Sequence, residues 1–267
     1  MDSGLFVVCA LTFVIHLIGA LAYSARIAGS RTGRLALTAA LFNILALVSR
    51  TANALQAPLV AKRIEENIAT VTAAEATADF RWILAAASVA TLVGALLIPT
   101  FQRLFGRYLD AFSEHRSAPR LVLRLFSPET IVDLREAATL PRWRNVVAAG
   151  RHPEIPWTLI LLNVGAQALW TVGVLASLYA AYLRPDLRVT SSQLAAVING
   201  VATVLMIVFI DPKVSIIADD VAQGLVSEAY FRRSIVWLAG SRLAGTLLAQ
   251  VILVPSAYCV AMLADRL

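Results

Sequence analysis

GLFVVCALTFVIHLIGALAYSA, residues 4–25, is an unbroken apolar run without a single charged side chain. A helix needs roughly 20 such residues to cross about 30 Å of hydrocarbon. Five further runs of this kind follow, so the sequence predicts an all-α polytopic membrane protein with six transmembrane helices. The predicted spans cover about residues 4–25, 35–57, 82–102, 157–183, 191–210 and 235–263.

The composition agrees with this class of protein. Hydrophobic residues make up 59% of the chain and charged residues 15%, and the mean hydropathy is +0.74. An ordinary soluble domain has about 25% charged residues. The net charge of +6 is not gathered in one patch, so we expect no nucleic-acid partner. No motif of a metal site, cofactor site or hydrolase is present, so we expect no cofactor, no metal, no catalytic residues and no enzyme.

The distribution of positive charge predicts the orientation in the membrane. The residues before the first run, MDSG, carry an acid and no base, unlike the positive start of a signal peptide. The loops after spans 1, 3 and 5 contain 15 Lys and Arg residues, and the opposite side contains 6. Because basic loops remain in the cytoplasm, we expect these three loops inside and both termini on the outer side.

The chain divides into two halves around a long basic segment. We predict a first three-helix half at 1–102, a cytoplasmic or interfacial segment at 103–156 and a second three-helix half at 157–267. A shift of 154 positions pairs Gly19 with Gly173. Halves with three spans each have opposite orientations, and such inverted repeats are typical of transporters. Chance similarity between two apolar segments is the alternative.

The middle segment mixes Arg with Leu, Phe and Tyr at helical spacing. This pattern occurs in QRLFGRYLDAFSEHR (102–116) and RLVLRLFSPETIVDLREA (120–137). Short amphipathic helices are expected there. They either lie in the headgroup layer or pack together as a cytosolic hairpin, since amphipathicity fits both.

Polar side chains recur at helical spacing inside the predicted spans. Asn43, Arg50, Asn53 and Gln56 fall on or near one face of the second span. For any single amide or hydroxyl, the alternative is a hydrogen bond between helices, worth about 0.6–2 kcal/mol. His16 alone is better explained as an interior histidine than as a ligand.

Two arginines, Arg50 and Arg242, fall inside predicted spans that contain no Asp or Glu. A central Arg costs about 2.5–3.5 kcal/mol, so each needs a partner or a water-filled cavity. A brace to backbone carbonyls of a neighbouring helix is the alternative for Arg50. At 1.5 Å per residue, Arg242 lies about 14 Å outward from Arg233, and Arg50 about 24 Å outward from Arg34.

Together these arginines predict a polar cavity that binds an anionic, phosphate-bearing substrate. The planar guanidinium matches phosphate oxygens, and the depths above describe a graded series from the inner mouth outward. The predicted substrate-binding residues are Arg26, Arg31, Arg34, Asn43, Arg50, Asn53, Arg242, His16 and Tyr23.

Three segments resemble the Amj family, whose name means alternate to MurJ: HLIGALAYSARIAGSRTGR (16–34), FNILALVSRTANALQAP (42–58) and DPKVSIIADDV (211–221). The resemblance extends over all six predicted helices. It implies a lipid II flippase of the bacterial cell (inner) membrane, active in peptidoglycan synthesis, cell-wall biogenesis and cell shape. Such a protein moves undecaprenyl-pyrophosphate-linked disaccharide-pentapeptide from the inner to the outer leaflet. The resemblance supplies no site residues.

Two other functions stay open at this point. A membrane phosphatase or transferase acting on a polyprenyl phosphate needs an acidic or histidine cluster at one mouth, and Asp219 and Asp220 are the candidates. A scaffold for wall-synthesis proteins leaves Arg50 and Arg242 without a role. The expected partners are lipid II and membrane lipids, with a homo-oligomer as a further option.

Overall fold

The computed structural model describes residues 2–67, 73–115, 127–150 and 155–267. Within these ranges the chain is almost entirely helical and contains no strand. Helices satisfy their backbone polar groups internally, which a chain surrounded by hydrocarbon requires. Six of the helical segments are long and apolar enough to cross a membrane. The prediction of a six-span all-α protein is therefore confirmed.

The first half is built around helix α1 (Ser3–Thr32). Asp2 caps its start by accepting a hydrogen bond from the Leu5 amide at 2.8 Å. Gly33 ends it in the left-handed conformation, with φ of 67°. Helices α2 (Leu35–Asn67) and α3 (Ala73–His115) both pack along α1. Helix α1 is thus the central element of this half, and its polar residues face neighbours on several sides.

The second half is built in the same way around helix α7 (Trp157–Leu183), which packs on α8 (Arg188–Val204) and α10 (Glu228–Ala264). The 3-10 turn η1 (Pro185–Leu187) links α7 to α8. Helix α8 continues through a π-helical turn, η2 (Leu205–Ile210), into α9 (Asp211–Ala222). A proline within a helix removes a backbone donor, and Pro212 is the second residue after this wider turn. The fifth span is therefore one long helical segment that extends beyond residue 210.

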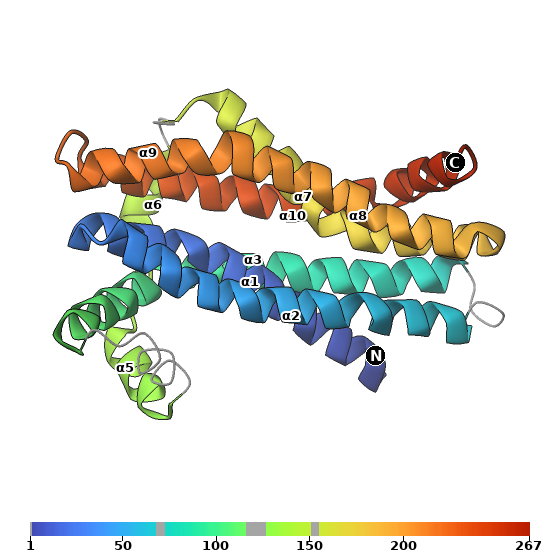
Figure 1. The fold of residues 1–267 in the computed structure, drawn as a ribbon, viewed down its shortest axis with the longest axis horizontal. Coiled ribbons are helices and arrows are strands. Elements are labelled where there is room, and N and C mark those ends of the chain that lie inside the picture. The colour runs from blue at the N-terminus through green and yellow to red at the C-terminus, as the bar shows by residue number, and fades with distance from the viewer. Residues whose placement is uncertain (1, 68–72, 116–126, 151–154) are drawn as a thin grey trace.

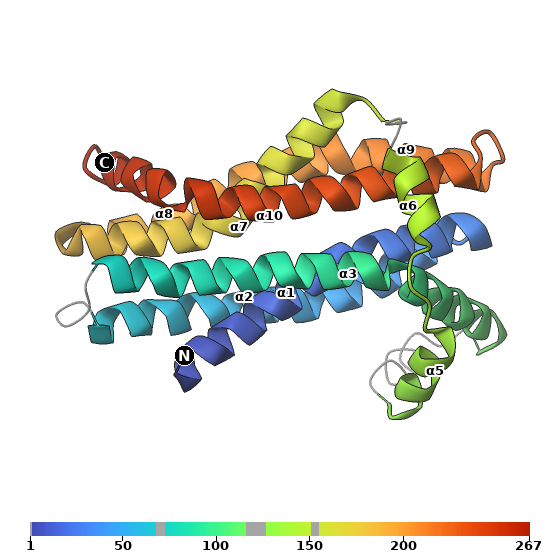
Figure 2. The ribbon, with the colours of Figure 1, turned by 180° about the vertical axis from the view of Figure 1, so that it is seen from behind.

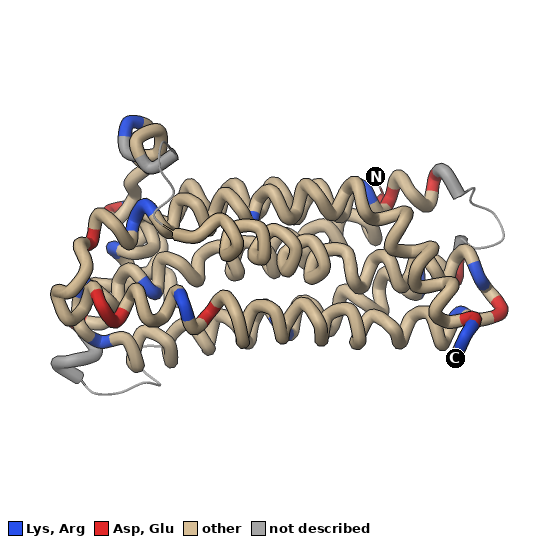
Figure 3. Tube along the Cα trace, turned by 90° about the horizontal axis from the view of Figure 1, so that it is seen from above, with Lys and Arg blue, Asp and Glu red and all other residues tan. Residues whose placement is uncertain are grey.

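The two halves lie side by side along the length of the molecule (Figures 1 and 2), with α3 against α10 and α1 against α9. The Thr77 hydroxyl is 2.9 Å from the Tyr179 hydroxyl, which joins α3 to α7. Gln250 donates to the Arg81 carbonyl at 3.0 Å, which joins α10 to α3. Charged residues gather at the two ends of the bundle and are sparse between them (Figure 3). This distribution fits a bundle whose middle lies in hydrocarbon.

The described part of the predicted middle segment packs on the end of the bundle. Helix α3 continues without interruption past residue 102 to His115, and the short helices α5 (Glu129–Ala137) and α6 (Trp143–Gly150) follow. The Tyr108 hydroxyl is 3.1 Å from the Thr130 hydroxyl, and Arg107 pairs with Glu136 at 3.0 Å. Predicted pieces at 116–126 lie outside the described residues. The choice between headgroup layer and cytosolic hairpin stays open.

Candidate functional site

A cavity of about 220 Å³ lies between the two halves. Its walls combine apolar side chains with two arginines, one carboxylate and the amides of Asn163 and Gln167. The residues come from α1, α2, α7, η2, α9 and α10. The lining comprises Ile15, Gly19, Ala22, Tyr23, Arg26, Phe42, Ser49, Asn163, Gln167, Trp170, Met206, Ile210, Asp211, Val214 and Arg242.

Arg242 is the deepest charged group of this cavity. It lies 14 residues into α10, about 21 Å from the start of that helix, and only 8% of its surface is exposed. Its Nε atom is buried and has no hydrogen-bond partner among the described residues. Burying a charge with an unsatisfied donor is expensive, and Tyr23 and Asp211 supply the nearby interactions that favour the charged guanidinium.

Gly19 on α1 makes room for the Arg242 side chain. A Cβ atom at position 19 would lie 2.1 Å from Arg242 Nη2 and 2.9 Å from its Cζ. Any larger residue at this position would require the guanidinium to move, so glycine is what lets Arg242 approach α1 this closely. Tyr23, one turn further along α1, is buried beside the same guanidinium and interacts with it. The structure thus brings two of the predicted residues, Arg242 and Tyr23, together in the wall of one cavity.

Arg26 and Asp211 stand at the more exposed end of the cavity. Arg26 Nη2 donates to Asp211 Oδ1 at 2.6 Å, and the two side chains are 27% and 47% exposed. The pair joins α1 of the first half to α9 of the second. The other terminal nitrogen of Arg26, Nη1, is buried without a partner. Arg26 thus has one nitrogen bonded to a carboxylate and one buried nitrogen without a partner among the described residues.

Sequence reasoning missed Asp211. The predicted fifth span ends at residue 210 and leaves Asp211 in the loop after it, whereas η2 carries the helix onward and brings Asp211 into the wall of the cavity. The dipeptide Asp211–Pro212 is typical of a turn, so the local sequence does not indicate this extension. Its pairing with Arg26, 185 positions away, could not be read from the pattern.

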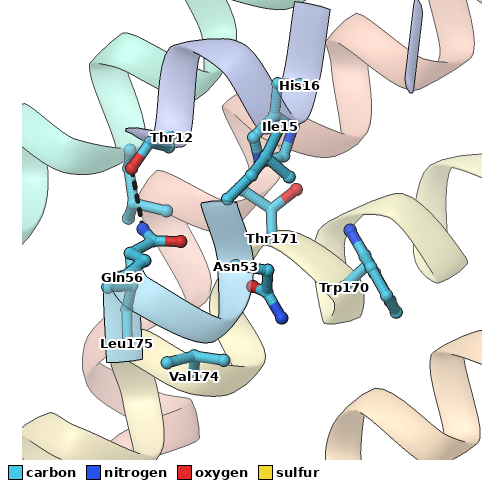
Figure 4. Close-up of a pocket in the computed structure, with 10 residues that line it drawn as sticks. Thr12, Ile15, His16, Asn53, Gln56, Trp170, Thr171, Val174 and Leu175 are labelled. Carbon is cyan, nitrogen blue, oxygen red and sulfur yellow. Dashed lines mark hydrogen bonds between the residues drawn. The ribbon is translucent and has the colours of Figure 1, made fainter. Parts of the chain in front are cut away.

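A second, water-sized cavity of about 20 Å³ lies next to the first, and the two share Ile15 and Trp170. Its polar wall includes His16 and Asn53 (Figure 4). Gln56 donates to the Thr12 hydroxyl at 2.7 Å, which ties α2 to α1. His16 is buried, and its Nδ1 has no partner among the described residues. A cavity of this size accommodates one water molecule.

The polar residues predicted on one face of α2 are separated in the structure. Asn53 and Gln56 face the smaller cavity, whereas Asn43 and Arg50 are exposed and line neither cavity. Arg50 has no hydrogen bond or ion pair with any residue that the structure describes, so the bracing alternative finds no contact there. The reason for the separation is geometric, because Asn43 and Gln56 differ by about 140° around a helix.

Arg31 and Arg34 lie near Arg26 in sequence but outside the cavity lining. Arg31 forms a bidentate pair with Glu228, at 3.1 and 3.2 Å. Arg34 donates to the Leu109 carbonyl at 2.7 Å. Arg31 therefore links the end of α1 to the start of α10, and Arg34 links the turn between α1 and α2 to α3. Asn163 likewise donates to Leu238 and Ser241 of α10, as the hydrogen-bonding alternative for single amides expects.

Asp219 and Asp220 give no sign of a catalytic centre. Asp219 is exposed and Asp220 partly exposed near the end of α9. No group of three or more potential metal ligands occurs among residues 2–67, 73–115, 127–150 and 155–267. Neither acid lines the cavity that contains Arg242.

The fold and the cavity define a multi-pass α-helical membrane protein with a charged site between two helical halves. The family described as "Amj: Alternate to MurJ" matches residues 11–264. The Lipid II flippase Amj of Bacillus subtilis (strain 168) is 36% identical over 261 residues, which cover 97% of this chain and 96% of that protein. No solved structure gives a significant match. The chain belongs to the Amj family, as its sequence motifs indicated.

Proposed function

We propose that this protein is a lipid II flippase of the bacterial cell membrane and that the cavity around Arg242 holds the diphosphate of its substrate. Membership of the Amj family and the 36% identity to a flippase over nearly the full length support the transport function. The buried, incompletely paired guanidinium of Arg242 is the observation that supports this location of the site.

The chemistry of the cavity matches the charged part of lipid II. Arg242 Nε and Arg26 Nη1 are both buried donors without partners among the described residues, and a diphosphate offers several acceptor oxygens. Charge-assisted hydrogen bonds from arginine to phosphate are about twice as strong as neutral ones. The amide of Gln167 and the indole of Trp170 supply further polar and aromatic contacts for sugar and peptide groups.

In the proposed orientation the Arg26 end of the cavity faces the cytoplasm, because the basic loops gather on that side, and both termini lie outside. The two halves, 1–102 and 157–267, act as inverted repeats that move against each other. Arg31 and Arg34 attract the headgroup at the inner mouth. The exposed Arg50, with Asn43, contacts it later on the outward path. A membrane potential of 100 mV favours the export of each negative charge by about 2.3 kcal/mol.

Reconstitution in liposomes with purified lipid II tests this proposal. We expect lipid II to reach the opposite leaflet chemically unchanged, and Arg242→Ala to remove this activity without loss of inserted protein. Arg242→Lys should recover only part, because a point charge replaces a planar fork. Arg266→Ala, an exposed arginine at the C-terminus, is the matched control.

The same experiment decides against the alternatives. A phosphatase or transferase would return an altered lipid, and Asp219→Asn with Asp220→Asn would abolish that reaction. A scaffold would leave lipid II in its original leaflet. Either result would overturn the flippase proposal.

A further inference from the structure

We infer that Asp211 is a built-in competitor for the substrate: its carboxylate occupies Arg26 in the empty protein, is displaced by the lipid diphosphate on loading, and takes Arg26 back on release. This inference rests on the proposed function, and it assigns a role to a residue that the sequence pattern did not single out.

The carboxylate of Asp211 and a phosphate group can bind the same nitrogen atoms of Arg26. A carboxylate and a phosphate use the same kind of acceptor oxygen toward a guanidinium. Asp211 Oδ1 lies 2.6 Å from Arg26 Nη2, while Arg26 Nη1 remains buried and unpaired. An incoming phosphate can therefore replace the carboxylate at Nη2 with one oxygen and, with another, satisfy Nη1, which the carboxylate leaves without a partner. Asp211 is 47% exposed, so water can solvate its carboxylate when it leaves.

Asp211 also lowers the net positive charge of the cavity. Arg26, Arg242 and Asp211 are the charged residues that line the cavity, so the empty cavity has a formal charge of +1. Without Asp211 the charge would be +2, and a doubly charged diphosphate would be held at two arginines with nothing to remove it. A competing carboxylate weakens the bound state and thereby speeds release.

The Arg26–Asp211 pair lies between the two halves of the protein and close to Arg242. Gly19, which receives Arg242, and Arg26 are seven residues apart on α1, about 10 Å along the helix, so a diphosphate at Arg242 lies close to the Arg26–Asp211 pair. That pair joins α1 to α9 and lines the more exposed end of the cavity. Exchange of the carboxylate for phosphate would therefore loosen the contact between the halves only when substrate is present.

The test measures binding and turnover separately in the full-length protein. For Asp211→Asn we expect lipid II to bind up to about fivefold more tightly, the upper end of the range for an exposed ion pair, while flipping at saturating lipid II slows at least about threefold. Asp211→Glu should restore both values, since it keeps the charge. Glu136→Gln, which breaks the exposed Arg107–Glu136 pair away from the cavity, should change neither.

A monophosphate lipid separates competition from a general charge effect. Undecaprenyl phosphate held at Arg242 leaves Arg26 with Asp211, so its affinity should not rise in Asp211→Asn. An equal gain for both lipids would mean that the variant only removes a negative charge, and the inference would be wrong. Unchanged or weaker lipid II binding would also overturn it. If the wild-type protein binds lipid II but does not move it, the flippase proposal fails while the binding comparison still decides the role of Asp211.

Discussion

Gly19→Ala should displace the guanidinium of Arg242, which packs closely against Gly19. In Gly19→Ala the new Cβ would lie 2.1 Å from Arg242 Nη2, whereas ordinary contacts begin at 3.4 Å. The guanidinium must therefore move by at least 1.3 Å, the difference of these two distances. Arginine is flexible, so the helices need not separate, and replacing a helical glycine by alanine stabilises a helix by about 0.5–1 kcal/mol. We expect a protein that folds and inserts as well as the wild type.

Its binding of lipid II, in contrast, should weaken. A shift of this size breaks a charge-assisted hydrogen bond, whose length is about 2.7–2.9 Å. Such a bond is worth about 1.5–3 kcal/mol, so the affinity for lipid II should fall roughly ten- to a hundredfold.

Equilibrium binding and thermal unfolding in the same detergent measure both sides of this prediction. Gly240→Ala is the matched control, because it lies on the same helix as Arg242 and a Cβ there has no neighbour within 4 Å. The control should bind lipid II normally. Wild-type affinity in Gly19→Ala would refute the placement of the diphosphate at Arg242. A lower melting temperature with normal affinity would make Gly19 a packing residue only.

Three further predictions concern packing, the exposed arginine and the N-terminus. Gly245→Ala should lower the melting temperature, because its Cβ would lie 2.7 Å from a backbone carbonyl oxygen of α7; unchanged melting would show that α7 and α10 tolerate a wider spacing. Arg50→Ala should insert at the wild-type level but flip lipid II more slowly, and an unchanged rate per inserted molecule would remove Arg50 from the path. The bond from the Leu5 amide, followed by that from Arg63, lowers the pKa of Asp2, so its stabilising effect should be present at neutral pH and disappear as the pH falls through this lowered pKa. Asn keeps the acceptor oxygen of the cap but not the charge, so Asp2→Asn should melt lower than wild type at pH 7, and the difference should shrink as the pH falls through this lowered pKa. Equal melting at every pH would contradict a contribution from the Asp2 charge.

Hydropathy was sufficient for the fold because each span is a single long apolar run. The sequence also predicted an unusual environment for Arg242, since an arginine inside a span requires one, and the structure places Arg242 beside Tyr23 in the wall of the larger cavity. The helical wheel was a weaker guide on α2, where it grouped Arg50 with Gln56 although only the latter faces the interior. Residues that lie within 140° of each other on a wheel can face different neighbours.

The contacts between halves could not be predicted in this way. The Arg26–Asp211 pair joins residues 185 positions apart, and the fit of Gly19 to Arg242 depends on how α1 crosses α10. Both follow from tertiary packing, for which a single sequence carries no periodic signal. The extension of the fifth span through a π-helical turn had the same consequence, because it moved Asp211 from an expected loop into the cavity wall.

The placement of the substrate diphosphate at Arg242 is tested by lipid II flipping per inserted molecule, compared between wild-type protein and Arg242→Ala in liposomes. We expect the wild type to expose intact lipid II on the opposite leaflet and Arg242→Ala, inserted to the same level, not to do so. Equal flipping by both proteins would contradict it, because a buried guanidinium on the substrate path cannot be removed without effect.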